Sequence, residues 1–283
     1  MENCLSLRGV RKRYGNFELD VSFTLPNGCI MGFVGENGAG KTTTFKLILD
    51  LIPRDEGEIC LFGQDNRAGG RSAREEIGVV FDECSFYEAL TPAEIGKILG
   101  GIHPHWENAL FRDYLRRWNL PEKKPLKAFS RGMKMKLSIA AALSRRPRLL
   151  LLDEATSGLD PVMRGEVLDV LQEFVQDEQH AVLLSSHITS DLDRVADYVT
   201  FLHAGRSILS ENKDTLLFQY GVAKGADALL DTLPRELVAG MRKGRYGSEA
   251  LVTDAQKARR ACPELTVDRP NLEEILVLLG KGM

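Results

Sequence analysis

Residues 35–42 read Gly-Glu-Asn-Gly-Ala-Gly-Lys-Thr, which fits the pattern Gly-x-x-x-x-Gly-Lys-Ser/Thr. Glycines let the backbone curl until successive amide groups face one anion, and the helix expected from Lys41 adds its positive N-terminal end. Lys41 places a charge beside the outer phosphates of a nucleotide, and the hydroxyl of Thr42 can bind Mg²⁺. The alternative interpretation is a glycine-rich turn beside an exposed lysine. The residues expected to bind a nucleotide here are Gly35, Glu36, Asn37, Gly38, Ala39, Gly40, Lys41, Thr42 and Thr43.

The segments around this loop alternate between short apolar runs and helical patterns. Residues 29–34 form an apolar run without alternation, which is typical of a strand covered on both faces. A helical pattern then runs from Lys41 until Pro53 ends it. Strands separated by helices predict an α/β fold with a largely parallel sheet. Further apolar runs of this kind recur at residues 77–81, 149–152, 181–184 and 198–202.

The composition is that of an ordinary globular protein. The 283 residues are 43% hydrophobic and carry a formal net charge of −3 at pH 7, which gives no general attraction to nucleic acid or to an anionic membrane surface. Five cysteines lie scattered without a Cys-x-x-Cys pair, which fits a reducing cytoplasm and argues against structural zinc. The start lacks a signal-peptide pattern, and there is no run of about 18 apolar residues that could cross a bilayer. We therefore expect a cytoplasmic chain with no nucleic-acid partner.

Two acidic residues follow the apolar run at 149–152, namely Asp153 and Glu154. A buried strand should not end in adjacent carboxylates unless something compensates their charge, because removing charge from water is costly. A magnesium ion and an attacking water would do so. Asp153 would then hold the metal through water, and Glu154 would activate the nucleophilic water. On its own, the pair could equally be a solvated strand end.

Four further features resemble the ATP-binding cassette (ABC) family of ATPases. Residues 129–134, Phe-Ser-Arg-Gly-Met-Lys, resemble the signature motif of that family. Residues 153–160, Asp-Glu-Ala-Thr-Ser-Gly-Leu-Asp, resemble its joined Walker B motif and D-loop. His187 stands where the family has its switch histidine, and Tyr14 resembles the aromatic residue that stacks on adenine; for each, the alternative is a residue that only packs. The resemblance covers residues 5 to 210, in the order of the family.

The resemblance implies the organisation of the chain as well as its fold class. That fold is α/β: a P-loop NTPase with a RecA-like parallel-sheet core, an N-terminal antiparallel β subdomain, a helical insertion and a small C-terminal appendage. The ATPase domain is expected to cover residues 1–212, with the helical insertion at about 91–146, where helical patterns replace the apolar runs. Residues 213–283 are expected to form a small α/β appendage.

The resemblance also implies that two chains pack head to tail with ATP and Mg²⁺ between them, as a homodimer or a heterodimer. Ser130 and the backbone of Gly132 would contact the γ-phosphate held by the other chain. His187 would orient that phosphate and the water, and Asp160 would communicate across the dimer. The expected catalytic residues are Lys41, Glu154 and His187, and the expected metal ligands are Thr42, Asp82 and Asp153.

Two parts of the sequence depart from the family pattern. Asp82 follows the apolar run 77–81 where the family has a glutamine, and because an aspartate can still bind Mg²⁺ or its water, we expect hydrolysis with altered metal geometry. Arg131 and Met133 replace a glycine and a glutamine of the signature. The sequence leaves open whether Arg131 caps phosphate charge or hinders close approach. It also leaves open whether two identical sites hydrolyse slowly or the natural partner is a different ATPase chain.

A separate transmembrane permease is the partner that the resemblance implies. The permease would enter a cleft between the helical insertion and residues 84–90, where Phe86 and Tyr87 fit either a partner contact or a buried local cluster. The short appendage favours an ATPase of an exporter for drugs, antimicrobial peptides or lipids, held at the inner face of the cell membrane through its permease. The alternatives are a soluble ABC ATPase that acts on ribosomes or DNA, and a P-loop kinase or regulatory switch outside the family.

Overall fold

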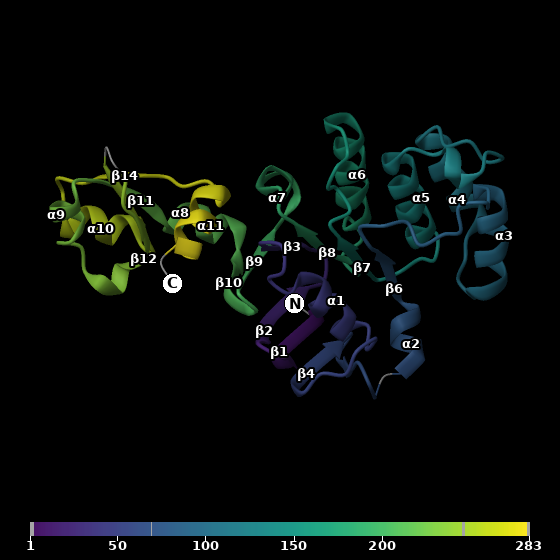
Figure 1. The fold of residues 1–283 in the computed structure, drawn as a ribbon, viewed down its shortest axis with the longest axis horizontal. Helices are drawn as coiled ribbons and strands as arrows, with labels where there is room; N and C mark the ends of the chain where they lie inside the picture. The colour runs from purple at the N-terminus through teal and green to yellow at the C-terminus, as the bar shows by residue number, and fades with distance from the viewer. Residues whose placement is uncertain (1–2, 69, 245–246, 282–283) are drawn as a thin grey trace. The chain divides into compact units, whose positions relative to one another are not determined.

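Two units make up the chain, Met1–Ser210 and Glu211–Met283 (Figure 1). The computed structural model describes residues 3–68, 70–244 and 247–281. The first unit holds a ten-stranded sheet, and the second holds a separate four-stranded sheet. Each unit has a hydrophobic core of its own.

The parallel half of the large sheet carries the loops of the predicted site. Its strands are β3 (Ile30–Gly35), β6 (Ile77–Val80), β7 (Leu149–Asp153), β8 (Ala181–Ser186) and β9 (Tyr198–His203). β3 pairs with β8 and β9, and β7 pairs with β6 and β8, always in parallel. Every residue of β3, β7 and β8 is buried, which confirms the strands predicted from uninterrupted apolar runs. Because the carboxyl ends of parallel strands meet at one edge, the loops after β3, β7 and β8 lie beside one another.

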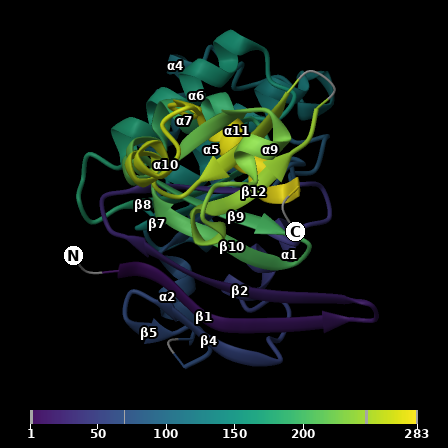
Figure 2. The same cartoon turned by 90° about the vertical axis from the view of Figure 1, so that its left-hand side faces the viewer.

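The other half of this sheet is mainly antiparallel. Its strands are β1 (Asn3–Tyr14), β2 (Phe17–Pro26), β4 (Glu56–Leu61), β5 (Gln64–Asp65) and β10 (Arg206–Asn212). β1 pairs with β2 and β4 in antiparallel fashion, and the long hairpin of β1 and β2 is visible in Figure 2. β10 runs parallel to β2, so the full order is β5-β4-β1-β2-β10-β9-β3-β8-β7-β6. The expected antiparallel subdomain is therefore continuous with the parallel core.

Helix α1 (Lys41–Ile48) packs between the two halves of the sheet. Phe33 of β3 lies between Phe23 of β2 and Phe45 of α1, with ring centroids 5.4 and 6.3 Å away. Burying three aromatic side chains together stabilises this contact between strand and helix. The helix that follows the glycine-rich loop is thus held from both halves of the sheet.

The expected helical insertion lies between β6 and β7. Its helices are α3 (Pro92–Ile102), α4 (Asn108–Arg117), the 3₁₀ turn η1 (Leu126–Ala128) and α5 (Arg131–Leu143). Thr91 and Glu94 form a capping box that starts α3. The remaining helices of the unit are α2 (Gly70–Glu75), α6 (Pro161–Phe174) and α7 (Thr189–Val195). Within the described residues, none of the helices is both long enough and apolar enough to cross a bilayer.

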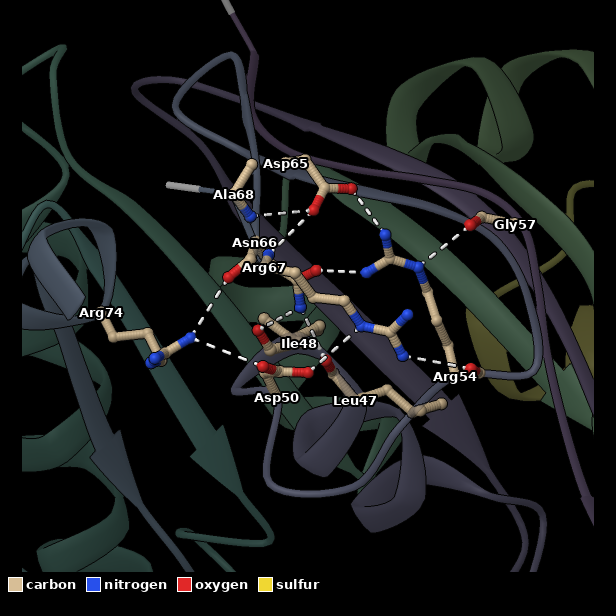
Figure 3. A network of polar contacts seen from close by, with 10 residues as sticks. All are labelled: Leu47, Ile48, Asp50, Arg54, Gly57, Asp65, Asn66, Arg67, Ala68 and Arg74. Carbon is tan, nitrogen blue, oxygen red and sulfur yellow. Dashed lines mark hydrogen bonds and ion pairs between the residues drawn. The ribbon is translucent and has the colours of Figure 1, made fainter. Parts of the chain in front are cut away.

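A buried asparagine fixes the far end of α1 (Figure 3). The Nδ2 atom of Asn66 donates to the carbonyl oxygens of Leu47 (2.9 Å) and Ile48 (3.1 Å) at the end of the helix. The guanidinium of Arg54 donates to Asn66 Oδ1 and to Asp65 Oδ2. The last carbonyl groups of a helix have no hydrogen-bond donor inside that helix, so Asn66 provides a donor for two of those in α1.

An Asn66→Ala variant should lower the free energy of unfolding by about 3 kcal/mol, because it removes the hydrogen bonds of Asn66 to the carbonyl groups of Leu47 and Ile48 and its charged hydrogen bond with Arg54. Urea denaturation followed by circular dichroism measures this change. The control is Asn16→Ala, which alters an exposed asparagine in the turn between β1 and β2 and should leave the midpoint unchanged. Equal midpoints for the two variants would contradict the assigned role of Asn66.

The second unit is an antiparallel sheet with helices. Its strands are β11 (Gly221–Gly225), β12 (Val238–Arg242), β13 (Ser248–Val252) and β14 (Thr266–Asp268), in the order β12-β13-β11-β14. Its helices are α8 (Lys213–Gln219), α9 (Asp227–Leu230), η2 (Arg235–Leu237), α10 (Ala255–Ala261) and α11 (Leu272–Lys281). From β11 to β14 this is a βαββαβ arrangement. The backbone of α11 lies so close to Gly240 that a side chain there would overlap the carbonyl of Leu278.

Candidate functional site

The loop between β3 and α1 has the conformation of an anion cradle. Gly38 and Gly40 have φ angles of 82° and 112°, in the left-handed region that favours glycine. Gly40 is also the residue before the first turn of α1, and a Cβ atom there would lie 2.5 Å from Leu19. The loop therefore needs glycine both for its backbone angles and for its space. Its amide groups precede the positive end of a helix, which is a favourable place for phosphate.

Lys41 is buried at the start of α1, with only 6% of its surface exposed. Its Nζ atom donates to the carbonyl oxygens of Gly35 (2.6 Å) and Glu36 (3.3 Å), and it lies 3.2 Å from Glu154 Oε1. A cavity of about 350 Å³ opens over this lysine and the loop. Its lining residues are Phe17, Glu36, Asn37, Gly38, Gly40, Lys41, Thr42, Thr43, Asp82 and Glu154.

Asp153 and Glu154 leave the end of β7 toward the phosphate loop. Asp153 is 2% exposed and accepts a hydrogen bond from Thr42 Oγ1 and another from Ser185 Oγ, each of 2.6 Å. Glu154 has a φ angle of 53°, and its Oε2 atom lies 2.7 Å from Nδ1 of His187. A left-handed backbone at a residue other than glycine costs energy, which proteins tend to accept at functional sites. The structure thus joins the loops after β3, β7 and β8 through side-chain contacts.

Ser185 is a member of this group that sequence reasoning missed. Its hydroxyl donates to Asp153 and accepts from the backbone amide of Glu154 (2.9 Å), so it orients both acidic residues. The signal was present, because Ser185 directly follows the apolar run at 181–184 and so belongs to the carboxyl end of a predicted strand. A polar residue at that edge of a parallel sheet lies where ligands bind.

Phe17 is a second residue that was not predicted for the site. Tyr14 and Phe17 are directly paired across the hairpin of β1 and β2, so their side chains share one face of the sheet. Phe17 lines the cavity, whereas Tyr14 is 46% exposed and has the Nζ atom of Lys12 5.5 Å from its ring centre. Phe17 thus places an aromatic ring beside the phosphate loop, and Tyr14 is its neighbour across the hairpin.

Ser130, Gly132 and Asp160 form a separate group. Ser130 caps α5 by accepting from the amide of Met133 (3.2 Å), and Asp160 caps α6 by accepting from the amides at its first turn. Gly132 is buried against α6, where a Cβ atom would lie 2.5 Å from the sulfur of Met163. Among the residues that the structure describes, neither Ser130 nor Gly132 nor Asp160 lines the cavity over the phosphate loop.

Comparisons with known proteins agree with this geometry. The family model for ABC transporters matches residues 19–157. A lantibiotic transport ATP-binding protein, SrtF of Streptococcus pyogenes, is 32% identical over 74% of this chain and 91% of its own length. Nod factor export ATP-binding protein I of Sinorhizobium fredii is 31% identical over 99% of this chain and 87% of its own length. A solved ATP-binding subunit of an ABC transporter is 28% identical with a TM-score of 0.68, over 75% of this chain and 91% of that structure.

Proposed function

We propose that this chain, which belongs to the family of ABC transporter ATP-binding subunits, hydrolyses Mg-ATP between two paired chains. Hydrolysis would drive export through a separate permease. ATP binding and hydrolysis on behalf of a transporter are properties of the family. The observation that carries the proposal is the position of Glu154, which lies between Lys41 at 3.2 Å and His187 at 2.7 Å on the cavity over the phosphate loop. The proposed location of the chain is the inner face of the cell membrane, where it would be held by binding to the permease.

Glu154 is the proposed general base. As a water attacks the γ-phosphorus, the water loses its proton to Glu154, and the bond from phosphorus to the β-phosphate oxygen breaks to give ADP and phosphate. Lys41 and the loop amides stabilise the negative charge that builds on the phosphate oxygens. His187 holds the Glu154 carboxylate in place and approaches the γ-phosphate. Phe17 and Tyr14 supply the face on which the adenine ring rests.

The side chains around Thr42 fit a magnesium ion. The Thr42 hydroxyl and the Asp153 carboxylate lie 2.6 Å apart, and the carboxylate of Asp82 lines the same cavity as Thr42. Within the described part of the chain, no group of three or more His, Cys, Asp or Glu side chains could hold a metal ion. Mg²⁺ commonly takes only one or two protein ligands and completes its octahedron with substrate phosphates and water, so this small set suffices. The bound ion would neutralise charge on the β- and γ-phosphates.

The separation of the site residues into two groups supports a composite site of two chains. The cavity over the phosphate loop has Lys41 and Glu154 on its wall, while Ser130 lies at the N-terminal end of α5, outside that lining among the described residues. A second chain in head-to-tail orientation would bring its Ser130 and the amide of its Gly132 to the γ-phosphate. A helix N-terminus is suited to that anion. Asp160, at the start of α6, would then lie near the contact between the chains.

A second cavity, of about 240 Å³, is the proposed contact for the permease. It lies between the end of β6 and the helical insertion, with Phe81, Phe86 and Arg145 among its lining residues. Tyr87 beside it is 74% exposed, whereas Phe86 is only partly exposed and lines the cavity. Aromatic side chains and arginine are enriched at the centres of protein interfaces. A short helix of a permease could bury Tyr87 and enter this cavity.

Co-purification tests the proposed partner. The chain is expressed together with any polytopic membrane protein that a neighbouring open reading frame encodes, the membranes are dissolved in detergent, and the chain is captured by an affinity tag. We expect the membrane protein to be retained, and a Tyr87→Ser variant to retain less of it. The matched control Tyr220→Ser changes a tyrosine in the second unit and should not affect retention. Recovery of the chain only with ribosomes or DNA would contradict the transporter function.

A further inference from the structure

A buried carboxylate lies one helical turn after His187. Asp191, in the first turn of α7, is 3% exposed. Its Oδ1 atom lies 3.3 Å from Nε of Arg164 on α6, whereas its Oδ2 atom is buried without a hydrogen-bond partner among the described residues. Burial raises the pKa of Asp191, while Thr156, Arg164, Arg194 and His187 act in the opposite direction. A charge in such a place is costly, so its presence needs a reason other than packing.

Thr156 faces this carboxylate from the loop that carries the acidic pair. It is fully buried, three residues after Asp153 and four before Asp160. Thr156 lowers the pKa of Asp191 against the effect of burial, yet among the described residues neither Thr156 Oγ1 nor Asp191 Oδ2 has a hydrogen-bond partner. The contact is therefore loose, and a small movement of the loop would make or lose a hydrogen bond to a charged acceptor.

The elements on either side of Asp191 are firmly placed. Leu192, its neighbour on α7, packs onto Gly32 of β3, where a Cβ atom would lie 2.9 Å from both of its methyl carbons. β3 leads directly into the phosphate loop. On the other side, Arg164 belongs to the first turn of α6, beside Met163, whose sulfur fills the space over Gly132. Asp191 thus connects the elements around the phosphate loop with the helix that contacts the signature segment.

We propose that Asp191 is a positioning residue for ATP hydrolysis, which holds the start of α6, and through it the loop that leads from Glu154, in register with the loop that carries His187. The inference rests on the proposed function of Glu154 and His187. Glu154 precedes Arg164 by ten residues, and His187 precedes Asp191 by four, so the ion pair between Asp191 and Arg164 holds the segment after the base against the segment after the histidine. A displacement of about 1 Å in such a site can cost about 100-fold in rate.

An Asp191→Asn variant separates positioning from mere packing, because asparagine keeps the shape and removes the charge that pairs with Arg164. In the 283-residue chain with Mg-ATP, we expect kcat to fall about 10- to 100-fold, with KM for ATP within about twofold of the wild type and an unchanged Tm. Asp169→Asn is the matched control. Asp169 pairs with Arg194 between the same two helices, but both side chains are half exposed, so kcat should not change.

Arg164→Gln removes the same ion pair by changing the more exposed of its two side chains. This variant tests the inference if the Asp191 variant does not fold. It should lower kcat by a similar factor, and the double variant should be no slower than either single variant. A kcat for Asp191→Asn within about twofold of the wild type, or a double variant whose loss is the product of the single losses, would overturn the inference. If the wild type itself hydrolyses no ATP, the proposed function is contradicted instead.

Discussion

A Glu154→Gln variant is expected to hydrolyse ATP at least about 100-fold more slowly than the wild type while it still binds the nucleotide. Glutamine has the same shape but cannot accept a proton from the attacking water. Lys41 keeps its hydrogen bonds to Gly35 and Glu36, so the phosphate loop retains its cation and its conformation. Phosphate release under steady-state conditions measures the rate, and titration with a fluorescent ATP analogue measures the affinity.

The same variant reports on the pairing of chains. Because hydrolysis is blocked, the paired state should accumulate in the presence of Mg-ATP. Size-exclusion chromatography with light scattering detects it as a doubling of mass. The control is Glu178→Gln, which changes an exposed carboxylate after α6 and should affect neither rate nor mass. A Glu154→Gln variant that hydrolyses ATP at the wild-type rate would remove Glu154 from the role of general base. A variant that stays a single chain in Mg-ATP, alone and with the permease, would contradict the composite site.

A Lys41→Ala variant should bind ATP at least about 100-fold more weakly than the wild type. Lys41 is the buried cation at the bottom of the cavity, and a single hydrogen bond to a charged phosphate oxygen contributes about 1.5–3 kcal/mol. The substitution also leaves the carbonyl oxygens of Gly35 and Glu36 and the Oε1 atom of Glu154 without their cation. Isothermal titration calorimetry with ATP in the presence of Mg²⁺ measures the loss.

Lys46→Ala provides the comparison for that measurement, because Lys46 lies on the same helix with its side chain exposed. Both variants remove one positive charge from α1, so a general effect of charge would appear in both. We expect Lys46→Ala to bind ATP as the wild type does. If Lys41→Ala binds ATP with an unchanged dissociation constant, the cavity over the loop is not the nucleotide site.

The central part of the site could be predicted from sequence because it depends on local rules. The glycine pattern at 35–42 fixes the backbone of the loop, and the acidic pair at 153 and 154 ends an apolar run that is typical of a buried strand. Parallel strands bring such ends together whatever the rest of the fold. The contacts of Lys41, Thr42 and His187 with these carboxylates follow from that single fact.

The remainder of the fold depends on pairings that no local pattern encodes. That Phe17 faces the cavity follows from the register of a two-residue hairpin, and the contact of Gly132 with Met163 follows from the way α5 and α6 pack. Asn66 meets the end of α1 across 18 residues of chain, and its sequence neighbours give no sign of it. In the second unit, short strands such as β14 (Thr266–Asp268) are too brief to show a period.

The hydrogen bonds between Asn66 and the end of α1 affect how fast nucleotide can be exchanged. Because Asn66 and Arg54 connect the far end of the helix to β5, we expect the amides at its near end to keep their orientation when no phosphate is bound. ATP would then bind to a phosphate loop that is already ordered, so that little conformational entropy of the loop would be lost on binding. If two chains pair as proposed, we expect turnover to be limited by their association and dissociation, and not by ordering of the phosphate loop.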